Sequence, residues 1–273
     1  MPITRILQLT DLHLFASPDE LLKGIPTREL LASVIAHIQQ SGESIDHVVV
    51  TGDHTHDELP ETYRVVRHLL APWIDRLWQV PGNHDDRAAL RSVFGDRTAG
   101  VGAERINFRF VAGNWICLGL DTHVPGQVPG RIDAEQVTWI RQQMADDRLT
   151  AAVLFMHHPP VLVGSVWLDR IGLEGKELVQ ELLLQEPRIR LVCCGHVHHE
   201  STHQIGNAMV VTTPSTGLQF SPLGDVATFL KAPPGYRMIE LHDDGCTTRV
   251  IRLPEAVFTP TEQRSESAVA TTG

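Results

Sequence analysis

Basic residues are scarce in this sequence relative to acidic ones. The 273 residues include 23 Lys and Arg against 33 Asp and Glu, and the formal net charge is -10. This balance argues against a surface for nucleic acid or for an anionic membrane, because both partners attract basic patches. It does not exclude a small phosphate ester as a substrate, since metal ions can neutralise a phosphate locally.

Cysteines and long apolar runs are also scarce. The chain has 4 Cys, of which Cys193 and Cys194 are adjacent. This pattern predicts buried structural thiols rather than a disulfide framework, and it favours a reducing cytoplasmic location. No apolar run approaches the roughly 18 residues that a membrane helix needs. The first residues lack a basic segment followed by an apolar one, so we expect neither a membrane partner nor a signal peptide.

Histidine, in contrast, is abundant, with 15 residues. The 42% hydrophobic and 21% charged content is typical of a globular protein of this length. We expect a single domain over residues 1–258 and a flexible tail over residues 259–273, where the sequence turns polar and small. The histidines either lie on the surface or gather into a metal site, and their positions in the sequence distinguish the two.

Short apolar runs alternate with segments of helical spacing in the first half of the chain. Strands are expected over residues 3–9, 47–50, 77–80, 151–156 and 190–194, with strand pairs at 105–110/115–120 and 236–241/246–253. Helices are expected over residues 27–41, from 60, from 133 to about 147, and over 174–184. Thr27 is expected to cap the first helix, and Asp133 with Gln136 to form a capping box.

Clusters of metal-ligand residue types follow five of the predicted strands. They are Asp11-x-His13, Gly52-Asp53, Gly82-Asn83-His84-Asp85, His157 and Gly195-His196-x-His198. One such cluster alone is more often a capping or solvated group. Five at the carboxyl ends of strands would bury carboxylates and imidazoles together, which is costly without a cation. Oxygen and imidazole ligands without thiolate favour Mn, Fe, Zn or Co over a zinc finger.

The order D-x-H, G-D, G-N-H-D, H and G-H-x-H resembles the calcineurin-like metallophosphoesterase superfamily. Within it, the sequence is similar to the class III cyclic nucleotide phosphodiesterases, in particular bacterial 3′,5′-cyclic AMP phosphodiesterases. Supporting stretches lie at residues 11–15, 165–169, 213–220 and 232–237, and the resemblance runs from about residue 3 to about residue 255. It implies an α/β fold of four layers, in which two mixed β-sheets form a sandwich flanked by α-helices.

The resemblance also implies a role for each motif residue. One metal ion, often iron, would be held by Asp11, His13 and His198. A second, often manganese, would be held by Asn83, His157 and His196, and Asp53 would bridge the two. Asp53 and His84 are the implied catalytic residues, and Asn83, His84 and His196 the implied substrate contacts. The implied reaction is in-line attack of a metal-bridging hydroxide on 3′,5′-cyclic AMP, which gives 5′-AMP and lowers cyclic AMP signalling.

Several alternatives stay open from the residues alone. A broad-specificity phosphodiesterase or nucleotide pyrophosphatase of the same superfamily would use the same motifs, and a degenerate scaffold would bind metal without turnover. A monomer and a homodimer are both compatible with the sequence. His157 or His158 could be the ligand, and the first is favoured because it follows the strand directly. His54 and His56 are interpreted as a polar loop at the rim of the site rather than as catalytic groups. Trp167, in a loop-like segment, is interpreted as a packing residue, with stacking on a base as the alternative.

Overall fold

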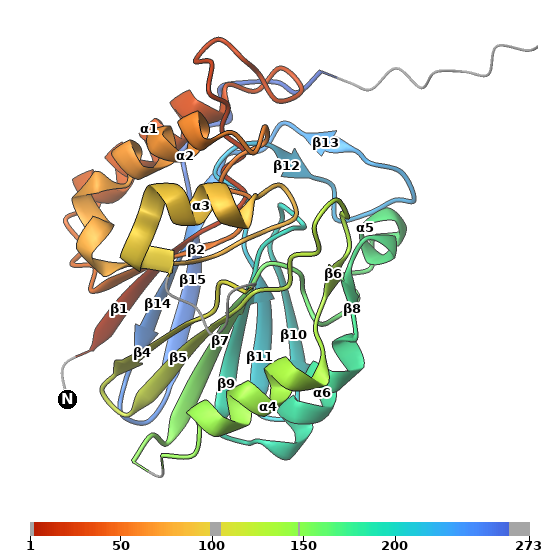
Figure 1. Ribbon diagram of the computed structural model, residues 1–273. Helices are drawn as coiled ribbons and strands as arrows, with labels where there is room; N and C mark the ends of the chain where they lie inside the picture. Colours follow the sequence, from red (N-terminus) through yellow and green to blue (C-terminus); the bar gives the residue numbers. More distant parts are fainter. Residues whose placement is uncertain (1–2, 99–104, 147, 262–273) are drawn as a thin grey trace, which may run out of the picture.

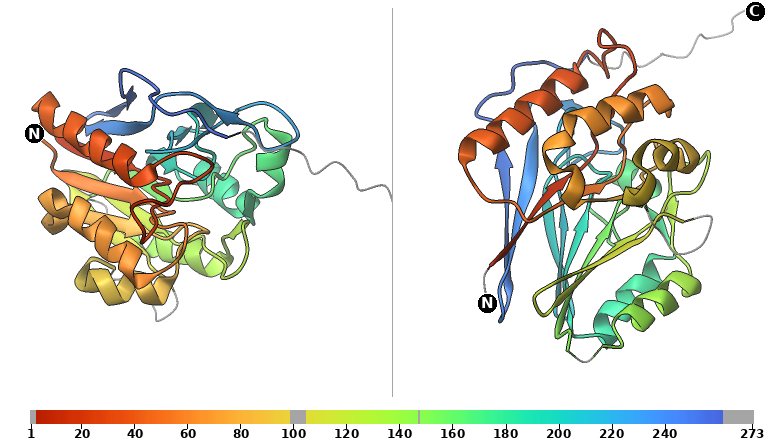
Figure 2. Two further views of the ribbon diagram at one scale, coloured as in Figure 1. Left: turned by 90° about the horizontal axis from the view of Figure 1, so that it is seen from above. Right: turned by 60° about the vertical axis from the view of Figure 1, so that its left-hand side comes forward.

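The computed structural model of the protein describes residues 3–98, 105–146 and 148–261. Within them, two mixed sheets pack face to face and helices cover both outer faces (Figure 1). The red-to-yellow helices of the N-terminal part lie on one side of the sheets and the green helices on the other (Figure 2). The predicted four-layer α/β sandwich is therefore confirmed.

The first sheet has the strand order β15-β14-β1-β2-β3. β1, β2 and β3 are parallel, and β14 and β15 add antiparallel strands at one edge. Their bounds are β1 Thr4–Leu9, β2 His47–Thr51, β3 Leu77–Val80, β14 Gly235–Leu241 and β15 Cys246–Arg252. The three parallel strands are largely apolar on both faces, with Gln8 and Gln79 among the buried polar exceptions, as expected for strands that are covered by a layer on each side.

The second sheet has the order β10-β11-β9-β7-β5-β4, parallel in its centre and antiparallel at both edges. Its strands are β4 Phe108–Ala112, β5 Trp115–Leu120, β7 Ala151–Met156, β9 Ile189–Cys194, β10 Ser201–Ile205 and β11 Ala208–Thr212. The sequence predicted most of these strands, but not the β10–β11 hairpin, in which the edge strand β10 alternates between half-buried and exposed residues.

Helices α1 to α3 cover the first sheet, and α4 and α6 cover the second. Their bounds are α1 Thr27–Ser41, α2 Pro60–Leu69, η1 Ala71–Arg76, α3 Arg87–Phe94, η2 Gly95–Thr98, α4 Ala134–Gln143 and α6 Lys176–Gln185. Small additions to the sandwich, which the sequence did not predict, are α5 Val166–Arg170, β6 Gly130–Arg131 paired with β8 Leu173–Glu174, and β12 Gln219–Phe220 paired with β13 Phe229–Leu230. Among the described residues, no helix is both long and apolar enough to cross a membrane.

Alternation along the strands divides the core into layers. In β1, Leu7 and Leu9 pack against the helices of the first sheet, whereas Ile6 faces the second sheet. Cys193 lies between the two sheets and Cys194 faces α4 and α6, and both are free thiols. Burial raises the pKa of the Cys193 thiol to about 12, so it stays protonated and apolar. The prediction of buried structural thiols is confirmed.

Two of the predicted helix starts differ from the structure. Pro26 is the residue that precedes α1, and the Thr27 hydroxyl donates to the carbonyl oxygen of His13 at 2.8 Å instead of capping the helix. Asp133 caps α4 as predicted, but the Gln136 amide donates to the Asp121 carbonyl, so the capping box is only half formed.

Two other bounds also differ. α4 ends at Gln143, before the expected end, and Asp147 lies outside the described residues. α6 begins at Lys176 rather than at the expected Glu174, because Glu174 belongs to the short strand β8. Most of the expected tail, residues 262–273, is likewise outside the described part of the chain.

Candidate metal centre

The five predicted motifs lie together at the carboxyl ends of β1, β2, β3, β7 and β9. Parallel strands that share an edge bring their following loops to one place, which is where open α/β sheets carry their sites. The loops after β1 and β2 run side by side, because the backbone N–H groups of Asp11 and His13 donate to the carbonyl oxygens of Gly52 and Asp53. Segments far apart in the sequence thus converge on one polar cluster.

One half of this cluster contains Asp11, His13 and His198. His13 Nε2 lies 3.1 Å from His198 Nε2, and His198 Nε2 lies 3.4 Å from Asp11 Oδ1. All three residues are buried, and together with Asp53 they form a group whose ligand atoms lie within 4.8 Å of one another. This is the composition of a mixed carboxylate and imidazole metal site.

The other half contains Asn83, His157 and His196. Asn83 Oδ1 lies 3.2 Å from His157 Nε2 and 3.0 Å from His196 Nδ1. Asp53 joins the two halves, since its Oδ2 is 3.3 Å from His13 Nε2 and 3.4 Å from His157 Nε2. Its other oxygen accepts a hydrogen bond of 2.8 Å from the His84 backbone N–H, which holds the carboxylate in this orientation.

The outward nitrogens of three imidazoles identify the atoms that point into the cluster. The N–H groups of His157 Nδ1, His198 Nδ1 and His196 Nε2 donate to the backbone carbonyls of Thr51, Leu218 and Ile171 at 2.7, 2.7 and 2.9 Å. In the neutral imidazole the other nitrogen then carries a lone pair.

Lone pairs therefore face one another at about hydrogen-bond distance across the cluster. His196 Nδ1 and Asn83 Oδ1, both acceptors, lie 3.0 Å apart with no proton to share. This contact is unfavourable in the metal-free chain and becomes favourable around a cation. The donor set thus fits metal ions.

Electrostatics divide the histidines further. Burial lowers the pKa of His196 to about 3 and that of His13 well below its usual value. Burial also opposes charge on His157, but the carboxylates of Asp53 and Asp11 outweigh it and raise its pKa to about 9. The metal-free chain therefore keeps His157 in its charged, doubly protonated form at neutral pH. A metal ion must displace the second proton.

Backbone strain is concentrated on the candidate ligands. Asp11, His13, Asp53, His196 and His198 all have positive φ angles, between 46° and 70°. Asp and His adopt this left-handed region more readily than most residues, but it still costs of order 1 kcal/mol or more at each position. Of the described non-glycine residues with positive φ, only Lys23 and Glu58 lie outside these five, and strain gathered on the polar residues of one cluster is typical of functional sites.

Two motif glycines are required by close approach. A Cβ atom on Gly82 would lie 2.2 Å from Asp53 Oδ1, and one on Gly195 would lie 2.0 Å from Thr10 Oγ1 and 2.9 Å from Asp11 Oδ2. Any side chain at either position would displace a carboxylate of the cluster. The glycines therefore serve the placement of Asp11 and Asp53.

His158 and His54 have roles that differ from a ligand or a rim residue. Both His158 nitrogens have protein partners, Thr122 Oγ1 at 2.8 Å and the Val128 carbonyl oxygen at 3.0 Å, which favours His157 as the ligand. The rim interpretation of His54 is wrong. Its side chain is 0% exposed and lies between Asp85 Oδ2 and Gln79 Oε1, each at 3.0 Å.

The roles of Asp85 and of His56 were not predicted from the sequence. Asp85 accepts from His54, from the Gly82 N–H and from the Tyr63 hydroxyl, so it fixes the loop that carries Asn83. His56 is half-buried against His13 and His84 rather than projecting from the rim. The only signal in the sequence was that His56 lies three residues after Asp53. That spacing did not distinguish a residue at the rim from one that contacts the cluster.

A cavity of ≈ 180 Å³ opens beside the cluster. Its lining includes polar residues, among them Asn83, His84 and His196, and four apolar residues, here called the apolar wall: Val128, Trp167, Ile171 and Phe220. Trp167, predicted in a loop, lies in α5 and contacts Phe220 edge to face at 5.1 Å. Phe220 in turn stacks on the ring of His198, with centroids 3.9 Å apart.

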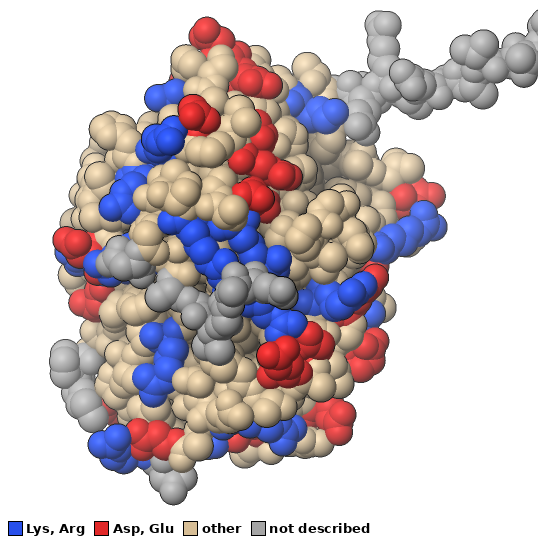
Figure 3. All heavy atoms as spheres, viewed as in Figure 1, with Lys and Arg blue, Asp and Glu red and all other residues tan. Residues whose placement is uncertain are grey.

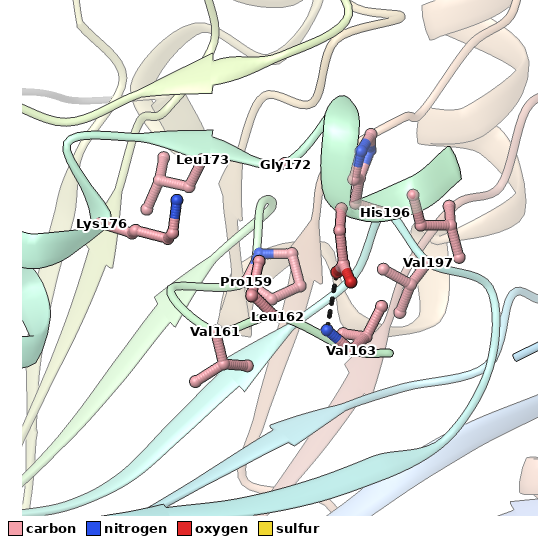
Figure 4. Close-up of a pocket in the computed structure, with 11 residues that line it drawn as sticks. Pro159, Val161, Leu162, Val163, Gly172, Leu173, Lys176, His196 and Val197 are labelled. Atoms are coloured by element: carbon pink, nitrogen blue, oxygen red, sulfur yellow. Dashed lines mark hydrogen bonds between the residues drawn. The ribbon is translucent and has the colours of Figure 1, made fainter. Parts of the chain in front are cut away.

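A second, much smaller cavity of ≈ 10 Å³ also has His196 in its lining (Figure 4). Pro159, Leu162, Val163 and Val197 are among the other residues around it. The Val163 N–H donates to Asp169 Oδ1 at 2.7 Å, which anchors this loop to α5.

The acidic charge of the chain is unevenly distributed over the surface. On the face in Figure 3, Lys and Arg side chains gather across the middle, with acidic groups above and below them. The formal charge of -10 therefore does not describe each face of the molecule.

Comparison with known proteins agrees with the fold and with the motifs. The calcineurin-like phosphoesterase family profile matches residues 4–200. The chain is 33% identical over 254 residues to the 3′,5′-cyclic adenosine monophosphate phosphodiesterase CpdA of Pseudomonas aeruginosa, covering 93% of this chain and 91% of that one. It is 34% identical over 258 residues to CpdA of Escherichia coli K12, covering 94% and 92%.

Among solved structures, a dimetal phosphatase from Danio rerio superimposes with a TM-score of 0.64 at 16% identity and covers 92% of this chain and 99% of that one. At this identity the likeness concerns the fold alone. The profile match and the two relatives establish that the chain belongs to the calcineurin-like phosphoesterase family. The resemblance drawn from the motif order is thus confirmed.

Proposed function

We propose that this protein is a metal-dependent phosphodiesterase that hydrolyses 3′,5′-cyclic AMP to 5′-AMP. The substrate is inferred from the CpdA relatives, which the chain matches over more than nine-tenths of its length. The observation that carries the chemistry is the pair of ligand groups that share Asp53 Oδ2. The cellular consequence would be weaker cyclic AMP signalling.

Two metal ions fit the cluster. Asp11, His13 and His198 would hold one, Asn83, His157 and His196 the other, and Asp53 would contact both. Iron and manganese are the proposed pair, with zinc or cobalt as substitutes that the same ligand types accept. When bound, the ions would neutralise the phosphate and lower the pKa of a water ligand.

His84 is proposed to protonate the leaving oxygen. It lines the cavity beside Asn83, and its ring packs on His13 and His56, so it is held in place while one edge faces the open space. Its backbone N–H simultaneously orients Asp53. One residue thus couples the position of the proton donor to that of the shared carboxylate.

The apolar wall of the larger cavity is proposed to receive the nucleoside. Trp167 and Phe220 offer aromatic surface, and Val128 and Ile171 offer aliphatic surface, all close to His196 and His198. A planar base binds such surfaces by packing, largely without hydrogen-bond readout. This arrangement supports a nucleotide substrate over a smaller phosphate ester.

The test is hydrolysis of 3′,5′-cyclic AMP by Mn²⁺-loaded protein, followed as 5′-AMP formation. His84→Ala is expected to lower kcat by about 10²- to 10⁴-fold while Mn²⁺ binding persists. Asn83→Ala is expected to lose bound Mn²⁺ as well as activity. His68→Ala, on an exposed position of α2, is the matched control and should leave both unchanged.

Substrate breadth separates this function from the broad-specificity alternative. Cyclic GMP, 2′,3′-cyclic AMP and bis(p-nitrophenyl) phosphate are compared with 3′,5′-cyclic AMP as kcat/KM ratios. A preference for 3′,5′-cyclic AMP supports the proposal. Equal turnover of the aryl diester would favour the general phosphodiesterase, and no turnover by metal-loaded protein would exclude both.

A further inference from the structure

The fourth imidazole of the metal centre has an unusual outward partner. His157, His198 and His196 each donate from the outward nitrogen to a backbone carbonyl. His13 instead directs Nδ1 at another imidazole nitrogen, Nδ1 of His56, at 3.3 Å. A carbonyl can only accept a hydrogen bond, whereas an imidazole nitrogen can donate or accept, so the direction of this bond depends on which nitrogen of His13 carries its proton.

The proposed metal centre determines the direction. His13 Nε2 lies inside the cluster, 3.1 Å from His198 Nε2 and 3.3 Å from Asp53 Oδ2, where a ligand lone pair is needed. With its lone pair on Nε2, neutral His13 carries its proton on Nδ1. His13 then donates to His56 Nδ1, which must present its own lone pair and carry its proton on Nε2.

The ring of His56 is held on several sides. It stacks on His84 with centroids 4.6 Å apart and planes at 22°, and it contacts Phe15 edge to face at 5.1 Å. Its backbone N–H donates to the Leu14 carbonyl at 2.8 Å, which ties the loop after β2 to the loop after β1. His56 therefore lies between a candidate ligand and the candidate proton donor, and it contacts both.

We infer that His56 is a positioning residue with two separable functions. Its Nδ1 accepts the His13 N–H and thereby orients His13 for metal binding, and its ring face fixes the rotamer of His84. This inference rests on the proposed metal centre and goes beyond it, because His56 belongs to none of the five motifs. Partners of this kind usually change metal affinity by 10- to 100-fold.

Two substitutions separate these functions. His56→Phe keeps a ring that stacks on His84 but has no acceptor for His13. His56→Asn keeps an acceptor, since its Oδ1 can take the place of Nδ1, but has no ring. Mn²⁺ affinity, measured by isothermal titration calorimetry, should fall at least tenfold in His56→Phe and stay within about threefold of the parent in His56→Asn. At saturating Mn²⁺, kcat should fall several-fold in His56→Asn and less in His56→Phe.

A spectroscopic readout accompanies the calorimetry. The visible absorption of the Co²⁺-loaded protein reports the ligand geometry, and it should change in His56→Phe and be restored in His56→Asn. His68→Phe is the control for a surface histidine exchanged for the same residue. Thermal unfolding of the metal-free variants checks that each one folds.

The outcomes are distinct. Equal Mn²⁺ affinity of the parent and His56→Phe, or an equal loss of affinity in both variants, would overturn the role of the acceptor. A third Co²⁺ ion that the parent binds and both variants lose would show that His56 is itself a ligand, which also overturns the inference. If the parent binds Mn²⁺ but does not hydrolyse cyclic AMP, the proposed function fails, whereas the affinity comparison still tests His56.

Discussion

The ionisation and orientation of individual residues in the cluster are set by the groups that they contact. Asp53 is the clearest case. Burial would raise its pKa, but His157 and His13 hold the pKa well below the usual value, so the carboxylate stays ionised. Its two oxygens have different tasks, one fixed by the His84 N–H and the other shared between His13 and His157. Such a residue tolerates little displacement.

Gly82→Ala tests this constraint directly. The new Cβ would meet Asp53 Oδ1 at 2.2 Å, so the carboxylate must move out of its shared position. We expect Mn²⁺ affinity to fall at least tenfold, and overpacking to lower the free energy of unfolding by about 1–3 kcal/mol. Gly245→Ala is the matched control, because a Cβ there meets nothing within 4 Å. Unchanged Mn²⁺ affinity in Gly82→Ala would show that Asp53 does not need this position.

At the scale of elements, helix starts and ends were predicted less well than strands. Strand runs are local in the sequence, whereas a cap depends on where a side chain finds its partner. Thr27 illustrates this, because it lies inside the first turn of α1 and its hydroxyl donates to the His13 carbonyl rather than accepting from a helix N–H. The same holds for Gln136, whose amide goes to Asp121. Both partners lie in other segments, so sequence spacing could not reveal them.

Asp133 offers a test at this scale. It accepts from the Gln136 N–H and pairs with Arg105, and Asp133→Ala removes both contacts. We expect the free energy of unfolding to fall by about 1 kcal/mol at pH 7, whereas Asp133→Asn should retain most of the cap. Chemical denaturation of the three proteins measures the difference.

The pH dependence of this effect has a definite sign. Burial opposes the charge on Asp133, but the hydrogen bonds from Gln136 and Arg105 outweigh it and lower the pKa from 3.8. A lowered folded-state pKa stabilises the protein fully above the unfolded value and loses that effect as the pH falls through the folded value. The difference between parent and Asp133→Asn should therefore shrink below about pH 4. A difference that grows with acid would contradict the assignment.

At the scale of the whole molecule, the candidate metal centre lies where the two sheets meet. Asp11, Asp53 and Asn83 follow strands of the first sheet, and His157 and His196 follow strands of the second. Bound ions would therefore crosslink the two halves of the sandwich. The strained backbone of the ligands is consistent with a fold that is completed by metal.

Metal removal should accordingly lower thermal stability. At a free Mn²⁺ concentration about 100-fold above Kd, binding adds about 2.7 kcal/mol to the native state. For a chain of this size, a chelator should then lower Tm by roughly 5–10 °C. Differential scanning calorimetry with and without EDTA measures the shift, and Asn83→Ala should show a smaller one. No shift on adding either EDTA or Mn²⁺ would contradict a metal centre at the sheet interface.

The sequence by itself determined most of the strands of the two sheets, the order of the motifs and the residue types of the candidate ligands, because strand runs and D-x-H or G-H-x-H spacings are local. Only the tertiary structure decided the orientation of each imidazole. It placed both nitrogens of His158 against Thr122 and Val128, buried His54 on Asp85 and set His56 against His13. A histidine has two nitrogens and several rotamers, and which nitrogen faces the site depends on partners that arrive from distant strands.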